Sequence, residues 1–254
     1  MNFVYLFPFT YFFNTRLRKG KIIFHIVFEW LAAVILLLLV GSFPANKTFL
    51  IAISSYSAFI SLYEIGYLVN DLFASHKEVN GRKRGPQGVS NIWVRTWIIS
   101  RCTVFLLLTT LLNNFASVEW WSFFIALCIV FSIHNVLTDY EMKVATFLWL
   151  AWFRFMAPLI FVVQDSQRMG VGLAAAIIYV TFRLLGYLDS KGLLQMPSRH
   201  QLEFRLFFFI HPLIGIVALW AYENAYGFLI LTGYYAVVAI LGSIGKIIWS
   251  RIQR

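Results

Sequence analysis

The sequence is poor in charged residues, and above all in acids, which excludes most soluble folds. Only 13% of the 254 residues are charged and 60% are hydrophobic, whereas soluble domains carry roughly 25% charged residues. Aspartate and glutamate together number 11. Apolar runs of the roughly 20 residues that cross a bilayer recur along the whole chain. The sequence therefore predicts an α-helical protein that crosses the membrane several times.

Familiar catalytic and cofactor patterns are also missing. There is no Ser-His-Asp arrangement, zinc-ligand spacing, Walker loop or dinucleotide fingerprint. The two cysteines, Cys102 and Cys128, lie within apolar runs, where we expect buried thiols and no disulfide. The net charge of +10 would suggest nucleic acid in a soluble protein. Here we expect no nucleic acid, and instead anionic lipid or a phosphorylated substrate. Nothing in the pattern specifies an oligomeric state.

One integral membrane domain is expected over residues 1–254, with no soluble domain among them. Its predicted architecture is an all-α transmembrane bundle of about eight to nine spans around a central cavity open to the cytoplasmic face. A short apolar patch at 4–13 is expected to be an interfacial or re-entrant segment. The eight spans that we predict are 22–42, 48–69, 94–112, 119–138, 144–163, 171–189, 204–222 and 226–248.

The positions of lysine and arginine predict the orientation. All but four of the 21 lie at the termini or in and beside connections on one side, which the positive-inside rule assigns to the cytoplasm. The exceptions are Lys47 and Arg168 on the other side, and Arg154 and Arg183 within spans. We therefore expect both termini in the cytoplasm, for a protein of a bacterial inner membrane. The two large cytoplasmic loops, 70–93 and 189–203, would then face one cavity.

Polar oxygens gather where the second span ends. Glu64 and Asp71 are seven residues apart and share a helical face. Asn70, Asp71 and Glu78 offer the hard oxygen ligands that Mg²⁺ takes alongside substrate phosphates. The plain alternative is that these residues only solvate the end of a helix.

Basic residues follow on the same loop. Arg82, Lys83 and Arg84 precede a Gly-Pro pair, and such side chains hold phosphate oxygens. Ordinary positive-inside bias explains them equally well. After the sixth span, Asp189 and Lys191 emerge on the same side as Asp71.

Arg154 lies about eleven residues into the predicted fifth span, near mid-bilayer at ~1.5 Å per residue. An arginine there needs a carboxylate, a carbonyl or a water-filled cavity. We expect Glu64 as its partner, either in a functional cavity or in a structural ion pair between helices.

The loop after the second span resembles the first motif of the UbiA superfamily of intramembrane prenyltransferases, NDxxDxxxD. Asn70 and Asp71 match that motif, Glu78 stands at its last acidic position, and Ala74 replaces the middle aspartate. The family's RPxxxGxxS segment resembles 84–90.

Three further positions resemble the family. Tyr140 and Lys143 are similar to the family's connection between helices four and five, and Arg154 to an arginine of its fifth helix. Asp189 falls at the second acidic motif, whose other acids are absent.

The resemblance implies a Mg²⁺-dependent transferase that acts on a polyprenyl (di)phosphate in the membrane. It assigns catalysis to Asp71, Glu78 and Asp189, and metal binding to the same acids with Asn70. The remaining substrate-binding residues that it implies are Arg82, Lys83, Arg84, Lys191, Tyr140, Lys143, Arg154, Glu64 and Tyr67.

Four functions remain open. The first is isoprenyl transfer from a polyprenyl diphosphate to an aromatic or other acceptor. The second is phosphoribosyl transfer from a small pyrophosphorylated sugar to a polyprenyl phosphate, as in one branch of the superfamily. The third is a non-catalytic lipid-binding or scaffold protein, suggested by Ala74. A small transporter is the fourth and is favoured least, because the charge gathers at one membrane face.

Overall fold

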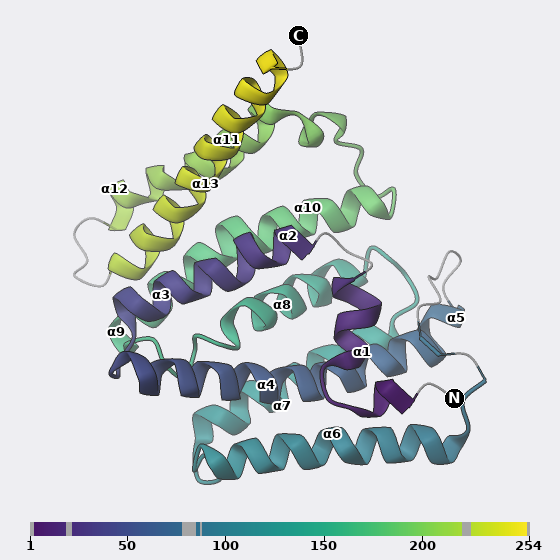
Figure 1. The fold of residues 1–254 in the computed structure, drawn as a ribbon. Coiled ribbons are helices and arrows are strands. Elements are labelled where there is room, and N and C mark those ends of the chain that lie inside the picture. Colours follow the sequence, from purple (N-terminus) through teal and green to yellow (C-terminus); the bar gives the residue numbers. More distant parts are fainter. Residues whose placement is uncertain (1–2, 19–21, 78–84, 87, 220–224, 253–254) are drawn as a thin grey trace.

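The protein is an all-helical bundle in a computed structural model that describes every residue except 1–2, 19–21, 78–84, 87, 220–224 and 253–254. No β-strand occurs in the described ranges. Figure 1 shows long helices stacked side by side, with a short N-terminal segment lying across them. The predicted all-α fold is confirmed.

Six helical segments are long and apolar enough to cross a membrane, which indicates an integral membrane protein. Three of them continue through short π-helical stretches, so several labelled elements form one rod. The segments are α2–η3–α3 (Ile22–His25, Ile26–Leu31, Ala32–Val40), α4–η4–α5 (Ala45–Val69, Asn70–Ala74, Ser75–Lys77), α6 (Asn91–Leu111), α7 (Val118–Val136), α9–η5–α10 (Asp165–Ala174, Ala175–Val180, Thr181–Ser190) and α13 (Tyr226–Ile252).

The distribution of side chains is that of a protein in lipid. Large apolar side chains such as Leu38, Leu107 and Ile129 are more than half exposed. Charged side chains such as Glu64 and Arg101 are fully buried. A soluble protein seldom buries charged side chains completely and avoids wide apolar surface, so the outer faces of these helices suit hydrocarbon.

Two predicted spans form shorter helices, and proline accounts for both. Helix α8 (Lys143–Met156) ends two residues before Pro158. Helix α11 (Leu202–Ile210) stops before Pro212, after which η7 (His211–Ile214) and α12 (Gly215–Leu219) continue the chain. Proline lacks the amide hydrogen and disfavours helical geometry at the preceding residue. The segments predicted at 144–163 and 204–222 are therefore not among the six long helices.

Helix α8 has neighbouring helices on two sides within the bundle. Helix α8 lies between α7 and α10, α4 packs on α6 and α7, and α13 packs on α9, α11 and α3. The N-terminal segment consists of η1 (Phe3–Leu6), α1 (Thr10–Phe12) and η2 (Phe13–Leu17). It contacts α4 and α6, so the patch expected at 4–13 docks on the bundle rather than crossing it.

π-Helical stretches recur around the cavity described below. The four in the described chain are η2, η3, η4 and η5, and they contain Arg16, Glu29, Asp71 and Tyr179 respectively. A π-helical turn contains one extra residue, which rotates the side chains that follow it. Such turns are frequent at functional sites. Here each stretch carries a polar side chain of one of the two buried clusters that border the cavity.

The expectation for the cysteines is half confirmed. Cys102 and Cys128 are free thiols, but both are exposed on the helix surface. An apolar run around a residue predicts a membrane helix without telling which face the residue takes. In a membrane protein the outer face is apolar too, so apolar surroundings do not indicate burial.

Candidate functional site

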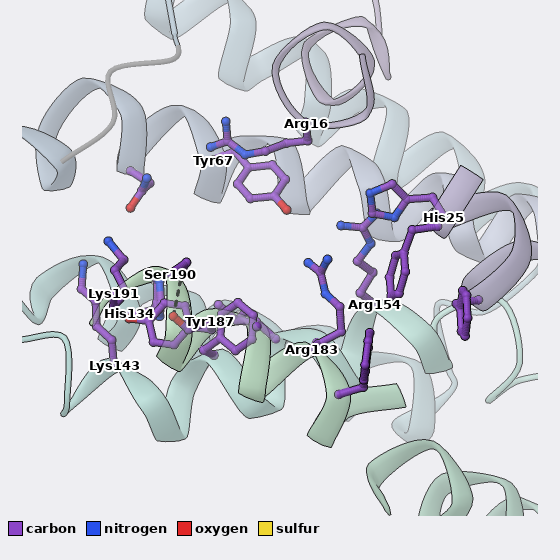
Figure 2. A pocket seen from close by; sticks show the side chains of 18 of the residues that line it. Arg16, His25, Tyr67, His134, Lys143, Arg154, Arg183, Tyr187, Ser190 and Lys191 are labelled. Carbon is purple, nitrogen blue, oxygen red and sulfur yellow. Dashed lines mark hydrogen bonds between the residues drawn. The ribbon is translucent and has the colours of Figure 1, made fainter. Parts of the chain in front are cut away.

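A cavity of about 810 Å³ lies between the end of α4, the N-terminal segment, α8, α10 and α11. Figure 2 shows its lining side chains converging from opposite walls. The lining contains seven lysine and arginine side chains and three histidines, against a single carboxylate, Asp71, among the described residues. The basic members are Arg16, Lys143, Arg154, Arg183, Lys191, Arg199, Arg205, His25, His134 and His200.

Aromatic side chains line much of the same cavity. Phe147 stacks on Tyr187 with ring centroids 4.4 Å apart, and Phe28 lies 5.2 Å from Phe209. The other aromatic lining residues are Phe24, Tyr63, Tyr67, Phe131, Tyr140 and Phe182. The cavity therefore offers positive charge together with an apolar wall, which suits an anionic amphiphile.

Asp71 is held in a buried ion pair. Its Oδ1 and Oδ2 atoms lie 2.9 and 3.0 Å from Nη2 of Arg16. The Tyr11 hydroxyl donates to Oδ2 at 2.7 Å, and the Asn70 amide donates to Oδ1 at 3.3 Å. Burial and the Asp71 charge raise the pKa of the Tyr11 hydroxyl, so it stays a donor.

Two further contacts complete this cluster. The Arg16 guanidinium lies over the Tyr67 ring, 4.2 Å from its centroid. Gly85 lies so close that an added Cβ would meet the Tyr11 hydroxyl at 2.7 Å. Gly85 therefore lies against the Asp71 cluster, and only glycine fits there without displacing a neighbour.

A second buried cluster forms around Arg154 at the deep end of the cavity. Its Nε and Nη2 atoms lie 3.0 and 2.9 Å from Oε2 of Glu29. Nδ1 of His25 lies 2.8 Å from Oε1 of Glu29 and 3.0 Å from Arg154 Nη2. The Tyr179 hydroxyl also donates to Glu29. This cluster joins four polar side chains from three helical segments.

The rim of the cavity is formed where α8 begins and α10 ends. Lys191 Nζ lies 3.8 Å from the centre of the Tyr140 ring. Nδ1 of His134 lies 2.8 Å from the Thr146 hydroxyl oxygen. Lys143 lines the rim from the first turn of α8 and is buried. Figure 2 shows Lys143, His134 and Lys191 grouped together, apart from Arg154 and Arg183.

The structure brings together most of the residues predicted from sequence. Asn70 and Asp71 from the first loop and Lys191 from the second line one cavity, as expected for two loops on one side. Tyr67, Tyr140, Lys143 and Arg154 line it as well. Glu78, Arg82, Lys83 and Arg84 lie outside the described residues.

Asp189 faces its own neighbours instead of the cavity. Its Oδ2 lies 2.5 Å from Nη2 of Arg199 and 3.7 Å from Nε2 of His200. Asp189 is not among the lining residues, although both of its partners are. It therefore orients two basic side chains of the rim.

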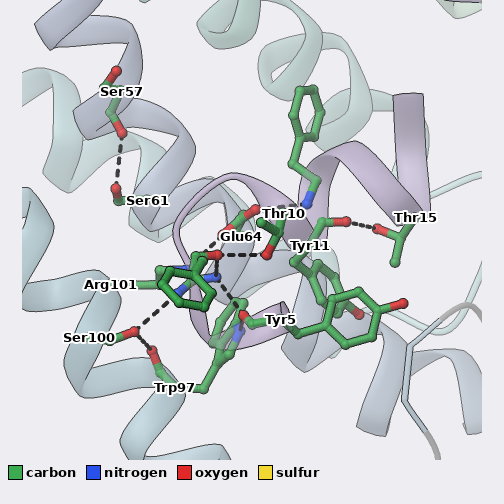
Figure 3. A network of polar contacts seen from close by, with 12 residues as sticks. Tyr5, Thr10, Tyr11, Thr15, Ser57, Ser61, Glu64, Trp97, Ser100 and Arg101 are labelled. Atoms are coloured by element: carbon green, nitrogen blue, oxygen red, sulfur yellow. Dashed lines mark hydrogen bonds and ion pairs between the residues drawn. The ribbon is translucent and has the colours of Figure 1, made fainter. Parts of the chain in front are cut away.

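The expected pairing of Glu64 with Arg154 is wrong. Glu64 pairs with Arg101 at 2.7 Å, and both side chains are completely buried away from the cavity. Glu64 also accepts from the Phe12 amide at 2.7 Å, and Arg101 donates to the carbonyls of Tyr5 and Phe7 at 2.8 Å. Figure 3 shows this network tying the N-terminal segment to α4 and α6.

The sequence analysis missed the partner that Arg154 does have. Glu29 is one of only 11 acids and lies inside a long apolar run. An ionisable residue in such a run is a candidate for a functional pair. That signal was present for both Glu29 and Glu64, but only the contact of η3 with α8 and the packing of α4 on α6 assign the partners.

Mg²⁺ does not fit the described carboxylates as they lie. Both oxygens of Asp71 contact Arg16, and Asp189 contacts Arg199. No group of three His, Cys, Asp or Glu side chains in the described chain could hold a metal ion. The remaining predicted carboxylate ligand, Glu78, lies outside that part. Magnesium therefore stays a prediction.

Comparison with known proteins gave no match to a family model, to a curated protein or to a solved structure.

Proposed function

We propose that this protein is a UbiA-like membrane transferase that binds the phosphorylated head of an isoprenoid lipid in the cationic cavity. The reaction is isoprenyl transfer from a polyprenyl diphosphate to an acceptor. The observation that carries the proposal is the charge of the cavity. Seven lysines and arginines line it, and the only carboxylate among the described lining residues is already paired.

The two kinds of lining suit the two parts of such a lipid. Lysine offers a point charge and arginine a fork of donors for phosphate oxygens. The rim side chains that carry these groups are Lys143, Lys191, Arg199 and Arg205. The aromatic wall offers apolar contact for the isoprenoid chain, which would otherwise lie in the hydrocarbon of the bilayer.

The proposed chemistry breaks the carbon–oxygen bond between the isoprenyl group and diphosphate. The allylic carbon then bonds to the acceptor, which releases a proton. Negative charge grows on the leaving diphosphate, so fixed cations at the rim lower the barrier by electrostatic stabilisation. The ion pair with Asp189 holds one of these cations, Arg199, in place before substrate arrives.

Two other functions are each favoured by one observation. Seven cations exceed what one phosphate head requires, which favours phosphoribosyl transfer, where both substrates are phosphorylated. The pairing of Asp71 with Arg16 favours a non-catalytic lipid-binding protein, because it engages a carboxylate expected at a catalytic site.

Pyrophosphate release by the purified protein tests the proposal. The assay offers a polyprenyl diphosphate with an aromatic acceptor, or a pyrophosphorylated pentose with a polyprenyl phosphate, each with and without Mg²⁺. Under the proposal the first pair releases pyrophosphate, and both Lys143→Gln and Lys191→Gln lower the rate at least tenfold. Lys47→Gln is the matched control, because Lys47 begins α4 at its other end, over Phe43.

The outcomes separate the three functions. Release with the pentose donor alone supports phosphoribosyl transfer. No release with any pair, together with stabilisation by polyprenyl phosphate, supports a lipid-binding protein and overturns the transferase proposal.

A further inference from the structure

Two arginines from different helices approach each other at the deep end of the cavity. Arg154 comes from α8 and Arg183 from α10, and both line the cavity. Figure 2 shows their guanidinium groups on the same side, beside His25 and away from the rim lysines. Two like charges repel, so this arrangement calls for a negative partner.

Glu29 forms an ion pair with Arg154 but not with Arg183, whose charge acts on Glu29 only from beyond ion-pair distance. The carboxylate lies 2.9 Å from Arg154 Nη2. No carboxylate of the described chain forms an ion pair with Arg183, and its buried Nε has no hydrogen-bond partner there. Its guanidinium carbon lies 5.6 Å from the centre of the Phe24 ring, which offers only a weak contact. The deep end therefore carries one positive charge in excess.

An uncompensated charge in a membrane interior is expensive and normally marks a site of function. Removing one partner of a buried pair is strongly destabilising because it leaves such a charge. The fold nevertheless retains Arg183 in this position. A bound anion would both pair the excess charge and use the donor that the protein leaves free.

The deep arginines are separate from the rim. Arg154 follows Lys143 by eleven residues on α8, which corresponds to about 16 Å along the helix. Aromatic side chains, among them Tyr67, Phe147 and Tyr187, line the wall between the two ends. A lipid phosphate stays at the depth of the membrane headgroups, near the rim. An anion at the deep end therefore belongs to another molecule.

We propose that Arg154 and Arg183 form a second anion-binding site, for the phosphate or carboxylate group of a compact water-soluble co-substrate. This inference rests on the proposed function, in which the rim holds the lipid phosphate. The planar guanidinium groups match the paired oxygens of either oxyanion. Glu29 positions Arg154, and Arg183 supplies the unpaired charge.

Thermal unfolding of the purified full-length protein in detergent tests this site. The probes are inorganic phosphate, pyrophosphate and benzoate, each compared with sodium chloride at equal ionic strength. The variants are Arg183→Gln and Arg183→Lys, with Arg168→Gln as the control. Arg168 pairs with Asp165 and Glu119 outside the cavity.

We expect at least one oxyanion to raise the melting temperature of the parent protein above the chloride value. Arg183→Gln should weaken that binding roughly ten- to hundredfold, as the loss of a charge-assisted hydrogen bond does. Arg183→Lys should bind with intermediate affinity, and Arg168→Gln should match the parent. Without ligand, Arg183→Gln should melt higher than the parent, because it removes a half-buried charge that forms no ion pair with the described residues.

Farnesyl phosphate distinguishes the deep site from the rim. Its stabilising effect should survive Arg183→Gln and be lost in Arg205→Gln, a change at the rim. If farnesyl phosphate has no effect on the parent, the proposed function fails, while the oxyanion result still decides whether the deep site exists.

Three results overturn the inference. The first is that no oxyanion stabilises the parent more than chloride. The second is that Arg183→Gln binds the oxyanion as tightly as the parent. The third is that the farnesyl phosphate effect depends on Arg183, because the lipid head would then occupy the deep end.

Discussion

Two buried carboxylate–arginine pairs occupy the interior of this bundle, and their surroundings differ. Glu64 and Arg101 are completely buried, and protein groups fill the space around them. Glu29 and Arg154 are nearly as buried, but Arg154 and the adjoining His25 line a cavity. The first pair fastens the N-terminal segment, and the second presents charge to a space that a ligand can enter.

The two pairs show that an ion pair between apolar helices does not by itself indicate a functional site. Each pair joins one acid and one arginine from different helical segments. The two pairs differ in the surroundings of the arginine, which are backbone carbonyls in the first pair and a cavity in the second. Arg101 donates from Nη2 to the carbonyls of Tyr5 and Phe7, while Arg154 lies beside Arg183, which has no ion-pair partner among the described residues.

Breaking the Glu64–Arg101 pair should have the largest effect on stability. Arg101→Met leaves the Glu64 carboxylate buried without a partner, which costs about 3–5 kcal/mol. It also frees two backbone carbonyls of the N-terminal segment. We expect little folded protein on size-exclusion chromatography and a much lower melting temperature.

A double variant tests the cause of that loss. Glu64→Leu with Arg101→Met removes both charges and should recover part of the stability. A single Arg101→Met variant that melts like the parent would show that the pair contributes nothing to the fold.

Breaking the Glu29–Arg154 pair should reduce stability less than breaking the Glu64–Arg101 pair, but should reduce oxyanion binding more. Arg154→Gln leaves Glu29 with the Tyr179 hydroxyl and His25, beside a cavity that admits water. We expect a loss of about 1–3 kcal/mol and, under the proposals, loss of oxyanion binding. Thermal unfolding with and without phosphate measures both, and Arg168→Gln serves as control. A stability loss as large as that of Arg101→Met would remove the distinction between the pairs.

Breaking the Asp71–Arg16 pair should cost about as much stability as breaking the Glu29–Arg154 pair. Asp71→Asn keeps the shape but removes the charge that holds Arg16 at 2.9 Å. We expect a loss of about 1–3 kcal/mol and, under the transferase proposal, slower pyrophosphate release because Arg16 is no longer fixed. Unchanged release would show that Asp71 has only a structural role.

Removing one hydrogen bond from that cluster should have the smallest effect. Tyr11→Phe deletes the donor 2.7 Å from Asp71, while Arg16 and Asn70 still donate to the carboxylate. We expect a loss of about 0.5–1.5 kcal/mol in thermal unfolding. Tyr226→Phe, on an exposed side chain, is the control and should leave stability unchanged.

The helical architecture was largely predictable because local signals determine it. Long apolar runs indicated the six long helices to within a few residues at most ends. The two failures share a cause that was visible in the sequence. Pro158 and Pro212 stop α8 and α11 before either reaches spanning length. Hydrophobicity alone does not distinguish a full span from a half-length helix.

The site was predictable in its location but not in its pairings. Seven of the predicted residues line one cavity, because helix ends on one side of a bundle converge. Arg183 and His25 were not proposed as ligand contacts, although a charge inside an apolar run is the signal that would find Arg183. The partner of Arg154 could not be chosen between Glu29 and Glu64 from spacing.

Composition and apolar periodicity by themselves determined that this chain is a helical membrane protein with charge gathered at helix ends and at a few interior positions. Those properties depend on neighbours within one helix. The tertiary structure alone decided which acid faces which arginine, because the partners lie 37 and 125 residues apart along the chain. It also decided that Arg183 lies beside a cavity without an ion-pair partner in the described part of the chain, since a missing partner is a property of the whole packing.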